Sequence, residues 1–214
     1  NACGKGSEMN DLETRMAATP GSEGSVDWES LRARLIERAE GDRLIELAYE
    51  RHDTPFGTLL VVSGGQGVLR IALDAEQEED VLGDLSRRVS PRIARTGRDV
   101  IAEARVQLDS YFRGDLQHFD LPLDWQLTRG FRREVLHETA AIPYGSTASY
   151  AEMAERAGSP RAVRAAGSAL ATNPLPIVVP CHRVLRSDGA VGSYLGGTSM
   201  KEALLAMERE RTND

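Results

Sequence analysis

Strand-like patterns of apolar residues fill the stretch between residues 44 and 73. The segments 44–49, 57–63 and 68–73 are short, rich in β-branched and large apolar residues, and bounded by turn formers. The glycine-rich segment 64–67 can adopt the positive φ angles that a hairpin turn requires. The pattern predicts a small antiparallel sheet.

Apolar positions three and four residues apart predict helices on either side of this sheet. Residues 76–89 and 98–112 follow it, and the second segment places its apolar residues on one helical face. A third segment precedes the sheet, with Ser25 as candidate N-cap and Gly41 as stop signal. The apolar face of that segment consists of Trp28, Leu31, Leu35 and Ile36.

A different pattern follows the interruption at Pro122. Residues 131–141 are amphipathic, residues 149–157 form a second helical segment behind the candidate N-cap Thr147, and residues 160–171 form a third. Two helices across a short turn predict a helix-turn-helix. The third helix is rich in Ala, Gly and Ser, which allows close approach to DNA but equally allows tight packing within a protein.

These patterns divide the chain into four parts. We expect a flexible tail over residues 1–25, an accessory helix over 26–43, an α/β domain over 44–125 and a mostly helical domain over 126–214. The tail is rich in turn formers and poor in large apolar groups. The chain has 214 residues, 41% of them hydrophobic, which is sufficient for two compact cores.

Charge alone leaves the partner open. The net charge of −7 argues against a strongly basic nucleic-acid-binding protein. The acidic residues are concentrated in residues 1–125, however, and residues 126–214 carry 11 Lys and Arg against 9 Asp and Glu. An acidic protein with a near-neutral half and a DNA-binding protein both fit this distribution.

The apolar runs and the cysteines indicate the compartment. No apolar run is long enough to span a bilayer and no signal-peptide pattern opens the chain, so we expect a cytoplasmic protein without a membrane partner. Cys3 and Cys181 form neither a disulfide framework nor a metal-ligand spacing with the histidines. We therefore expect a reducing compartment, no metal site and no cofactor. The composition, rich in Arg and Ala, is typical of a bacterial protein.

Cys181 is the candidate nucleophile. It lies in the segment NPLPIVVPCHRV, beside His182 and Arg183, and we expect an apolar strand to lead into it. A cysteine attacks as the thiolate, which requires a nearby base or cation and a partly open site, and the two neighbours can supply both groups. Adjacent side chains on a strand point to opposite faces, so a turn must directly follow the strand if Cys181 and His182 are to work together. A Cys-His hydrolase would also contain this pair.

Most of residues 129–209 resembles the O6-alkylguanine-DNA alkyltransferases, whereas residues 45–125 match that family only loosely. The resemblance implies a ribonuclease H-like α/β domain followed by a winged-helix-like helix-turn-helix domain. Arg132 and Leu136 depart from the family pattern at positions that we expect to touch the domain interface or the DNA backbone. The motifs that carry the resemblance are IPYGSTASY at 142–150, Asn173-Pro174, PCHRV at 180–184 and GAVGSY at 189–194, with Lys201 and Glu208 downstream.

The resemblance implies a chemical role for four residues. In this family a cysteine takes the alkyl group from O6 of a guanine that has been flipped out of the duplex. Cys181 would be the nucleophile, His182 the base, acting directly or through water, and Glu208 the group that orients the imidazole. Asn173 would brace the turn, its amide bonding two backbone groups.

The resemblance also implies DNA and base contacts. Arg164 would fill the space vacated by the flipped nucleotide, because a planar guanidinium can stack on bases. Tyr150 would help to rotate the nucleotide and would donate a hydrogen bond to the guanine. The other implied contacts are Arg161, Ala165, Gly167, Val184, Ser193, Tyr194 and Leu195.

We therefore predict a DNA repair protein that transfers alkyl groups from O6 of guanine, and from O4 of thymine, in double-stranded DNA irreversibly onto Cys181. It would be a monomer in solution that can cluster on DNA. A non-catalytic sensor of alkylated bases is an alternative that the presence of Cys181 disfavours. A hydrolase is a second alternative, disfavoured by the small-residue helix that carries Arg164.

Overall fold

The computed structural model describes residues 27–212, so the predicted tail, the candidate cap Ser25 and Cys3 lie outside the described residues. The chain divides into two compact units, residues 1–38 and residues 39–214. Each unit is described by itself.

The predicted helix before the sheet is α2, Trp28–Gly41, and it ends at the predicted glycine. Asp27 caps its first turn, because its carboxylate accepts hydrogen bonds from the backbone N–H and the hydroxyl of Ser30. This local arrangement fixes the start of the helix one residue after Asp27.

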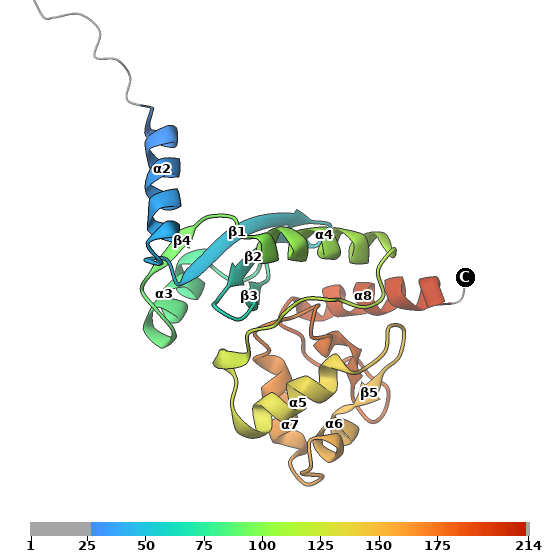
Figure 1. Ribbon diagram of the computed structural model, residues 1–214. Helices are drawn as coiled ribbons and strands as arrows, with labels where there is room; N and C mark the ends of the chain where they lie inside the picture. Colours follow the sequence, from blue (N-terminus) through green and yellow to red (C-terminus); the bar gives the residue numbers. More distant parts are fainter. Residues whose placement is uncertain (1–26, 213–214) are drawn as a thin grey trace, which may run out of the picture. The chain divides into compact units, whose positions relative to one another are not determined.

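The sheet contains one more strand than the sequence indicated. Strands β1 (Leu47–Thr54), β2 (Gly57–Ser63) and β3 (Val68–Ala72) pair antiparallel, as predicted (Figure 1). Strand β4 (Ile93–Arg95) pairs parallel with β1, which gives the order β3-β2-β1-β4. The sheet is therefore mixed, because β4 adds one parallel pairing to the three predicted antiparallel strands. β4 is too short to show an alternating pattern, so only its pairing with β1 defines it.

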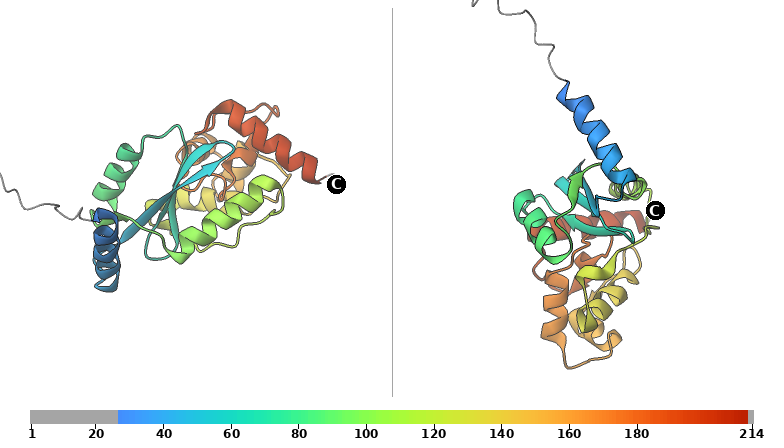
Figure 2. Two further views of the ribbon diagram at one scale, coloured as in Figure 1. Left: turned by 90° about the horizontal axis from the view of Figure 1, so that it is seen from above. Right: turned by 60° about the vertical axis from the view of Figure 1, so that its left-hand side comes forward.

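Both faces of the sheet are covered. Helices α3 (Glu78–Arg88) and α4 (Asp99–Arg113) form close to their predicted positions and cover opposite faces (Figure 2). Leu59 on β2 belongs to the core that includes α4, whereas its neighbour Leu60 belongs to the core that includes α3. Because side chains alternate along a strand, the continuous apolar run of β2 requires cover on both sides.

The remainder of the chain is mostly helical. Helices α6 and α7 pack on each other and on α5, and form the predicted helix-turn-helix. A short parallel pair, β5 with β6, joins two loops of this part. The elements are η1 (Trp125–Leu127), α5 (Gly130–Ala140), β5 (Ala148–Ser149), α6 (Tyr150–Arg156), α7 (Val163–Ala171), η2 (Cys181–Arg183), β6 (Val184–Leu185) and α8 (Gly197–Thr212).

Two helix starts differ from the prediction. Ser149, and not Thr147, caps α6: its hydroxyl accepts from the N–H of Glu152, whose carboxylate accepts from the N–H of Ser149. α7 begins only at Val163, because residues 160–162 form a turn. Arg161 therefore precedes the helix instead of lying on it.

The C-terminal helix α8 was not predicted. It carries many charged residues, yet it buries one side, including Leu204, Leu205 and the charged residues Lys201 and Glu208. α8 lies beside α4 in Figure 1, and Arg211 donates a hydrogen bond to a backbone oxygen of α4. This placement brings Glu208 to Tyr111 of α4, which lies 97 positions earlier in the chain.

Candidate active site

Cys181 begins a single 3₁₀ turn, η2, and does not follow a strand. Residues 177 and 178 form a turn between the isolated bridge partners Pro176 and Val179 instead of the expected strand, and Ile177 has a left-handed backbone conformation with φ 74°. Prolines 174, 176 and 180 cannot donate a backbone hydrogen bond, so a regular strand ladder cannot run through this segment. The predicted turn at the Cys-His pair is present as η2.

The thiol of Cys181 is buried, with 5% of the residue exposed, and not partly open as we expected. Nδ2 of Asn173 donates to its Sγ at 3.2 Å and to the oxygen of Val179 at 2.8 Å, while Oδ1 accepts from the N–H of Leu175 at 3.0 Å. Burial raises the pKa of Cys181, although the Asn173 hydrogen bond and the charge of Lys201 oppose this. The resting group is a thiol, and its reaction requires a base.

His182 and Glu208 form a buried pair. Nε2 of His182 lies 2.9 Å from Oε1 of Glu208. Burial lowers the pKa of His182 more than Glu208 raises it, so the ring is neutral at neutral pH. Burial alone would raise the pKa of Glu208, but hydrogen bonds from His182 and Arg183 outweigh it and lower that pKa to about 2. The pair therefore rests as a neutral imidazole beside a carboxylate.

The other ring nitrogen of His182 is free to accept a proton. Nε2 faces a carboxylate oxygen, so the neutral ring carries its proton there and leaves Nδ1 as an acceptor. Nδ1 is buried and has no hydrogen-bond partner among residues 27–212. Within the same residues no direct hydrogen bond joins it to Sγ of Cys181, so a link between the two atoms requires a bridging molecule.

Arg183 has a different role from the one that its position beside Cys181 indicated. We expected a cation close to the thiol, but the guanidinium binds Glu208 in a bidentate manner, with Nε 2.9 Å from Oε2 and Nη2 2.9 Å from Oε1. Nη1 donates to the backbone oxygen of Ile142 at 2.6 Å. Arg183 therefore compensates the buried charge of Glu208.

Sequence analysis assigned no role to Tyr111 or Lys201, yet both reach this cluster. The hydroxyl of Tyr111, on α4, donates to Oε1 of Glu208 at 2.6 Å. The ammonium of Lys201 donates to the backbone oxygen of Val184 at 2.6 Å and lies 5.9 Å from the centre of the Tyr150 ring. Tyr111 lies on an apolar helical face, so nothing in its local sequence set it apart, whereas Lys201 was noted only as one of the residues that carry the resemblance.

Tyr150, at the start of α6, lies among residues that we expect to bind the base. Its hydroxyl faces Gly192, where a Cβ would come within 2.6 Å, and its ring lies 3.8 Å from the Cβ position of Gly167. Burial raises the pKa of Tyr150, so the hydroxyl keeps its proton and can donate. Tyr194 packs edge-on against His182, with ring centroids 6.3 Å apart.

The remaining expected contacts divide between surface and interior. Val184 is buried and Leu195 is half-buried, next to Tyr194. The exposed residues of the predicted set are Arg161, Arg164, Ala165 and Ser193. The two arginines therefore lie on the outside of the helix-turn-helix, whereas Cys181, His182, Asn173 and Glu208 form one interior cluster.

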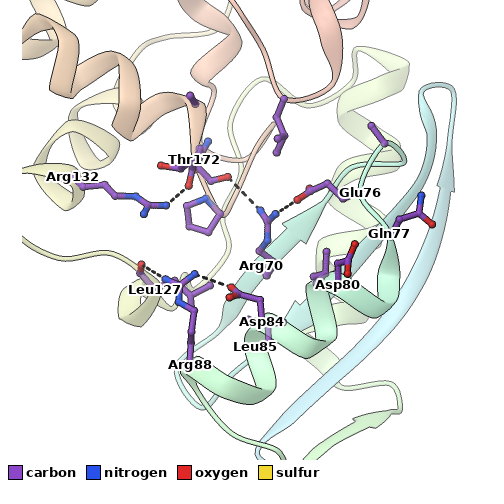
Figure 3. Close-up of a pocket in the computed structure, with 16 residues that line it drawn as sticks. Arg70, Glu76, Gln77, Asp80, Asp84, Leu85, Arg88, Leu127, Arg132 and Thr172 are labelled. Carbon is purple, nitrogen blue, oxygen red and sulfur yellow. Dashed lines mark hydrogen bonds and ion pairs between the residues drawn. The ribbon is translucent and has the colours of Figure 1, made fainter.

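A cavity of about 560 Å³ adjoins the loop that carries Asn173 (Figure 3). Arg70 donates to the backbone oxygen of Asn173 at 3.4 Å, and the N–H of Ile71 donates to that of Pro174 at 2.8 Å. Arg132 points into the cavity and donates to the backbone oxygen of Thr172. These contacts join the sheet and α5 to the loop beside Cys181. The other departure from the family pattern, Leu136, is fully buried in the core.

No helix within residues 27–212 has the length and apolar character needed to cross a membrane. The same part of the chain contains no group of three or more His, Cys, Asp or Glu side chains that could hold a metal ion.

The two parts of the fold correspond to two domains of one known protein family. Residues 47–125 match the ribonuclease-like domain of 6-O-methylguanine DNA methyltransferase, and residues 130–210 match the DNA binding domain of the same protein. The matches define a two-domain protein with a cysteine in its helical domain. The chain belongs to the 6-O-methylguanine DNA methyltransferase family.

Individual relatives agree with this assignment. The methylated-DNA–protein-cysteine methyltransferase of Mycolicibacterium paratuberculosis is 38% identical over 170 residues, which cover 78% of this chain and 94% of the relative. The constitutive enzyme of Bacillus subtilis is 37% identical over 75% of this chain and 94% of its own length. The crystal structure of Mycobacterium tuberculosis OGT in complex with DNA has a TM-score of 0.65 and 36% identity, covering 77% of this chain and 94% of that one.

Proposed function

We propose that this protein repairs DNA by transferring the alkyl group of O6-alkylguanine in double-stranded DNA to Cys181. The observation that carries the proposal is the buried thiol of Cys181, which accepts a hydrogen bond from Asn173. The next residue, His182, is paired with Glu208 through Nε2, and its Nδ1 is free to accept a proton. The named relatives are methyltransferases of methylated DNA and protein cysteine, which supports the same reaction. O4-alkylthymine, which presents an equivalent exocyclic oxygen, is the second substrate that we propose.

The reaction is a single displacement. The thiol proton passes to Nδ1 of His182 through one bridging water, and Glu208 stabilises the imidazolium that forms. Sγ of Cys181 then attacks the alkyl carbon, the bond from that carbon to O6 breaks, and its electron pair remains on the guanine. The guanine takes up one proton and His182 gives up the one that it received from the thiol, so the protons balance. The products are an S-alkylcysteine and an unmodified guanine. A thioether is stable, so each protein molecule reacts once.

The exposed part of the helix-turn-helix is the proposed DNA surface. The thiol cannot reach an alkyl group on a base that is stacked in the duplex, so the nucleotide must be flipped out. We propose that the flip occurs through the minor groove. Arg164 and Ala165 are exposed on α7, and the exposed Arg161 lies two residues before that helix. Arg164 would occupy the vacated space, while Tyr150 and the segment from Ser193 to Leu195, with Val184 and Gly167, would surround the extruded base.

We further propose that the protein acts as a monomer that can cluster on DNA, in the cytoplasm of a bacterium. The partner is DNA, to which the matched DNA binding domain corresponds.

The direct test is the intact mass of the protein after incubation with a duplex that contains one O6-methylguanine, followed by peptide mapping. We expect a gain of one methyl group on Cys181 that saturates at one per protein molecule. Cys181→Ala should gain nothing yet still bind the duplex, and an unmethylated duplex should leave the wild-type mass unchanged. Lesion-dependent binding without a mass gain would assign the protein to the sensors, and turnover of an ester would assign it to the hydrolases.

A further inference from the structure

Tyr111 comes from the α/β part of the fold but lies against the chemistry of the helical part. It is fully buried, and its ring packs against Phe112, Phe119 and Tyr144 at centroid distances of 5.2–6.1 Å. These apolar contacts fix the direction of the hydroxyl. A buried hydroxyl without a partner is costly, and this one is directed at Glu208 and His182.

The position of its proton follows from the acceptors around it. The hydroxyl donates its one proton to Oε1 of Glu208 at 2.6 Å, so its oxygen can only accept from Nε2 of His182, 3.3 Å away. Nε2 therefore faces two acceptor oxygens, one from Glu208 and one from Tyr111. The ring proton belongs on Nε2, and Nδ1 is left bare.

We propose that Tyr111 is a positioning residue for the alkyl transfer, which holds His182 and Glu208 so that Nδ1 of His182 is the proton acceptor. The proposal rests on the proposed function, since it gives Tyr111 a part in that reaction. It also gives the ribonuclease-like domain a part in the chemistry, because α4 supplies the hydroxyl.

The expected pH effect has a definite sign. By donating to Glu208, Tyr111 takes up part of the carboxylate charge that would otherwise favour protonation of His182. Without the hydroxyl, the pKa of His182 rises and the ring stays protonated up to a higher pH. An imidazolium cannot accept the proton of the thiol. The acidic limb of the rate profile should therefore move to higher pH. The groups that face His182 are Cys181 and Arg183 from η2, Glu208 and Lys201 from α8, Tyr111 from α4 and Tyr194 from the loop before α8.

The test is single-turnover methyl transfer by full-length Tyr111→Phe, measured between about pH 5.5 and 9. We expect the rate at about pH 7 to fall about tenfold and most of the loss to be recovered at about pH 9, with unchanged affinity for the duplex. A loss of the same factor at every pH indicates a merely structural role and overturns the proposal, as does an unchanged rate.

Tyr144→Phe is the matched control. It removes a hydroxyl that is buried without a hydrogen-bond partner among the described residues, from a ring that packs against Tyr111 with centroids 6.1 Å apart. It should keep the wild-type profile, and a profile shifted like that of Tyr111→Phe would overturn the proposal.

A measurement on the wild-type protein covers the case in which Tyr111→Phe does not fold. The ¹⁵N shifts of the His182 ring, assigned by their loss in His182→Gln, should show a neutral ring protonated at Nε2. A ring protonated at Nδ1 overturns the proposal. If the wild-type protein transferred no methyl group, the proposed function would fail, whereas a His182 ring protonated at Nδ1 would overturn the part of Tyr111 independently of that result.

Discussion

Three neighbouring side chains, Cys181, His182 and Glu208, rest in different protonation states because each has a different environment. Burial raises the pKa of the thiol and lowers that of the imidazole, so both are neutral, whereas the hydrogen bonds from His182 and Arg183 keep Glu208 ionised despite its burial. Proton donor, proton acceptor and counter-charge are thereby assigned to separate groups. The thiol becomes a strong nucleophile only when His182 takes its proton.

Glu208→Gln should change both the rate and the acid stability of the protein. The pKa of Glu208 is lowered from 4.5 to about 2, so its ionised form stabilises the fold above about pH 4.5, and this contribution is lost as the pH falls towards 2. The melting temperature of the wild type should therefore drop more steeply across this window than that of Glu208→Gln. The variant should also transfer methyl groups at least about tenfold more slowly at neutral pH, because an amide does not stabilise the imidazolium.

Glu202→Gln, an exposed change on the same helix α8, is the control and should behave like the wild type. An unchanged transfer rate in Glu208→Gln would remove Glu208 from the proton-transfer network.

At the level of single elements, short-range hydrogen bonds decide at which residue each helix of the helix-turn-helix begins. The capping box of Ser149 and Glu152 makes Tyr150 the first residue of α6. The N–H of Ala162 bonds the oxygen of Ser159, which closes the turn before α7 and leaves Arg164 in the first turn of that helix. The places of Tyr150 and Arg164 along their helices therefore depend on two local hydrogen-bond patterns.

Ser149→Ala should destabilise the protein by about 1 kcal/mol, because the N–H of Glu152 loses its acceptor. Thermal unfolding measures the effect as a lower melting temperature. Thr147→Ala is the matched control: Thr147 is exposed and does not cap the helix, so its loss should leave the melting temperature unchanged. Equal effects of the two changes would contradict the observed cap.

Arg164→Lys should slow alkyl transfer from duplex DNA, although the substitution keeps the positive charge. A lysine keeps the attraction to phosphate but cannot stack on bases as a planar guanidinium does. We expect a rate loss with duplex substrate and none with the free O6-methylguanine base, where no nucleotide must be flipped. Arg156→Lys, on α6, provides a charge-conserving comparison. Equal rates of Arg164→Lys and wild type on duplex DNA would argue against the proposal that Arg164 occupies the space vacated by the flipped nucleotide.

Within residues 39–214, the two domains meet around the loop of residues 172–180, which leads to Cys181 and is called the thiol loop below. The sheet holds this loop through the N–H of Ile71 and the guanidinium of Arg70, while α4 reaches Glu208 through Tyr111. Asn173 connects the loop to Sγ of Cys181. A disturbance at the thiol therefore reaches contacts that join the two domains.

Alkylation of Cys181 should lower the melting temperature of the whole protein. An added methyl group enters a site that is 5% exposed, where Nδ2 of Asn173 already lies 3.2 Å from the sulfur, and such overpacking costs about 1–3 kcal/mol. Calorimetry of the methylated and unmethylated proteins measures the difference, with protein incubated with unmodified duplex as the reference. Equal melting temperatures would show that the site accommodates the thioether without strain.

The sequence was sufficient wherever information is local. Alternation and helical spacing predicted three strands and the helices from α3 to α7, because periodicity reflects which side of an element is buried. The motifs around Cys181 indicated that the amide of Asn173 braces the turn, and its predicted bonds to two backbone groups are present. The roles of Cys181 as nucleophile and His182 as base stay predictions. Residue types that must act together lie close in the chain there.

Only the tertiary structure decided what depends on pairing between distant segments. β4 is defined by its pairing with β1, and the buried face of α8 by the core around it. The left-handed backbone at Ile177 is likewise a feature of the folded loop. Tyr111 is an ordinary core tyrosine by its helical spacing, yet 97 positions separate it from the Glu208 that it binds. Side-chain hydrogen bonds between distant residues leave no periodic trace in a sequence, and these bonds set the protonation of the site.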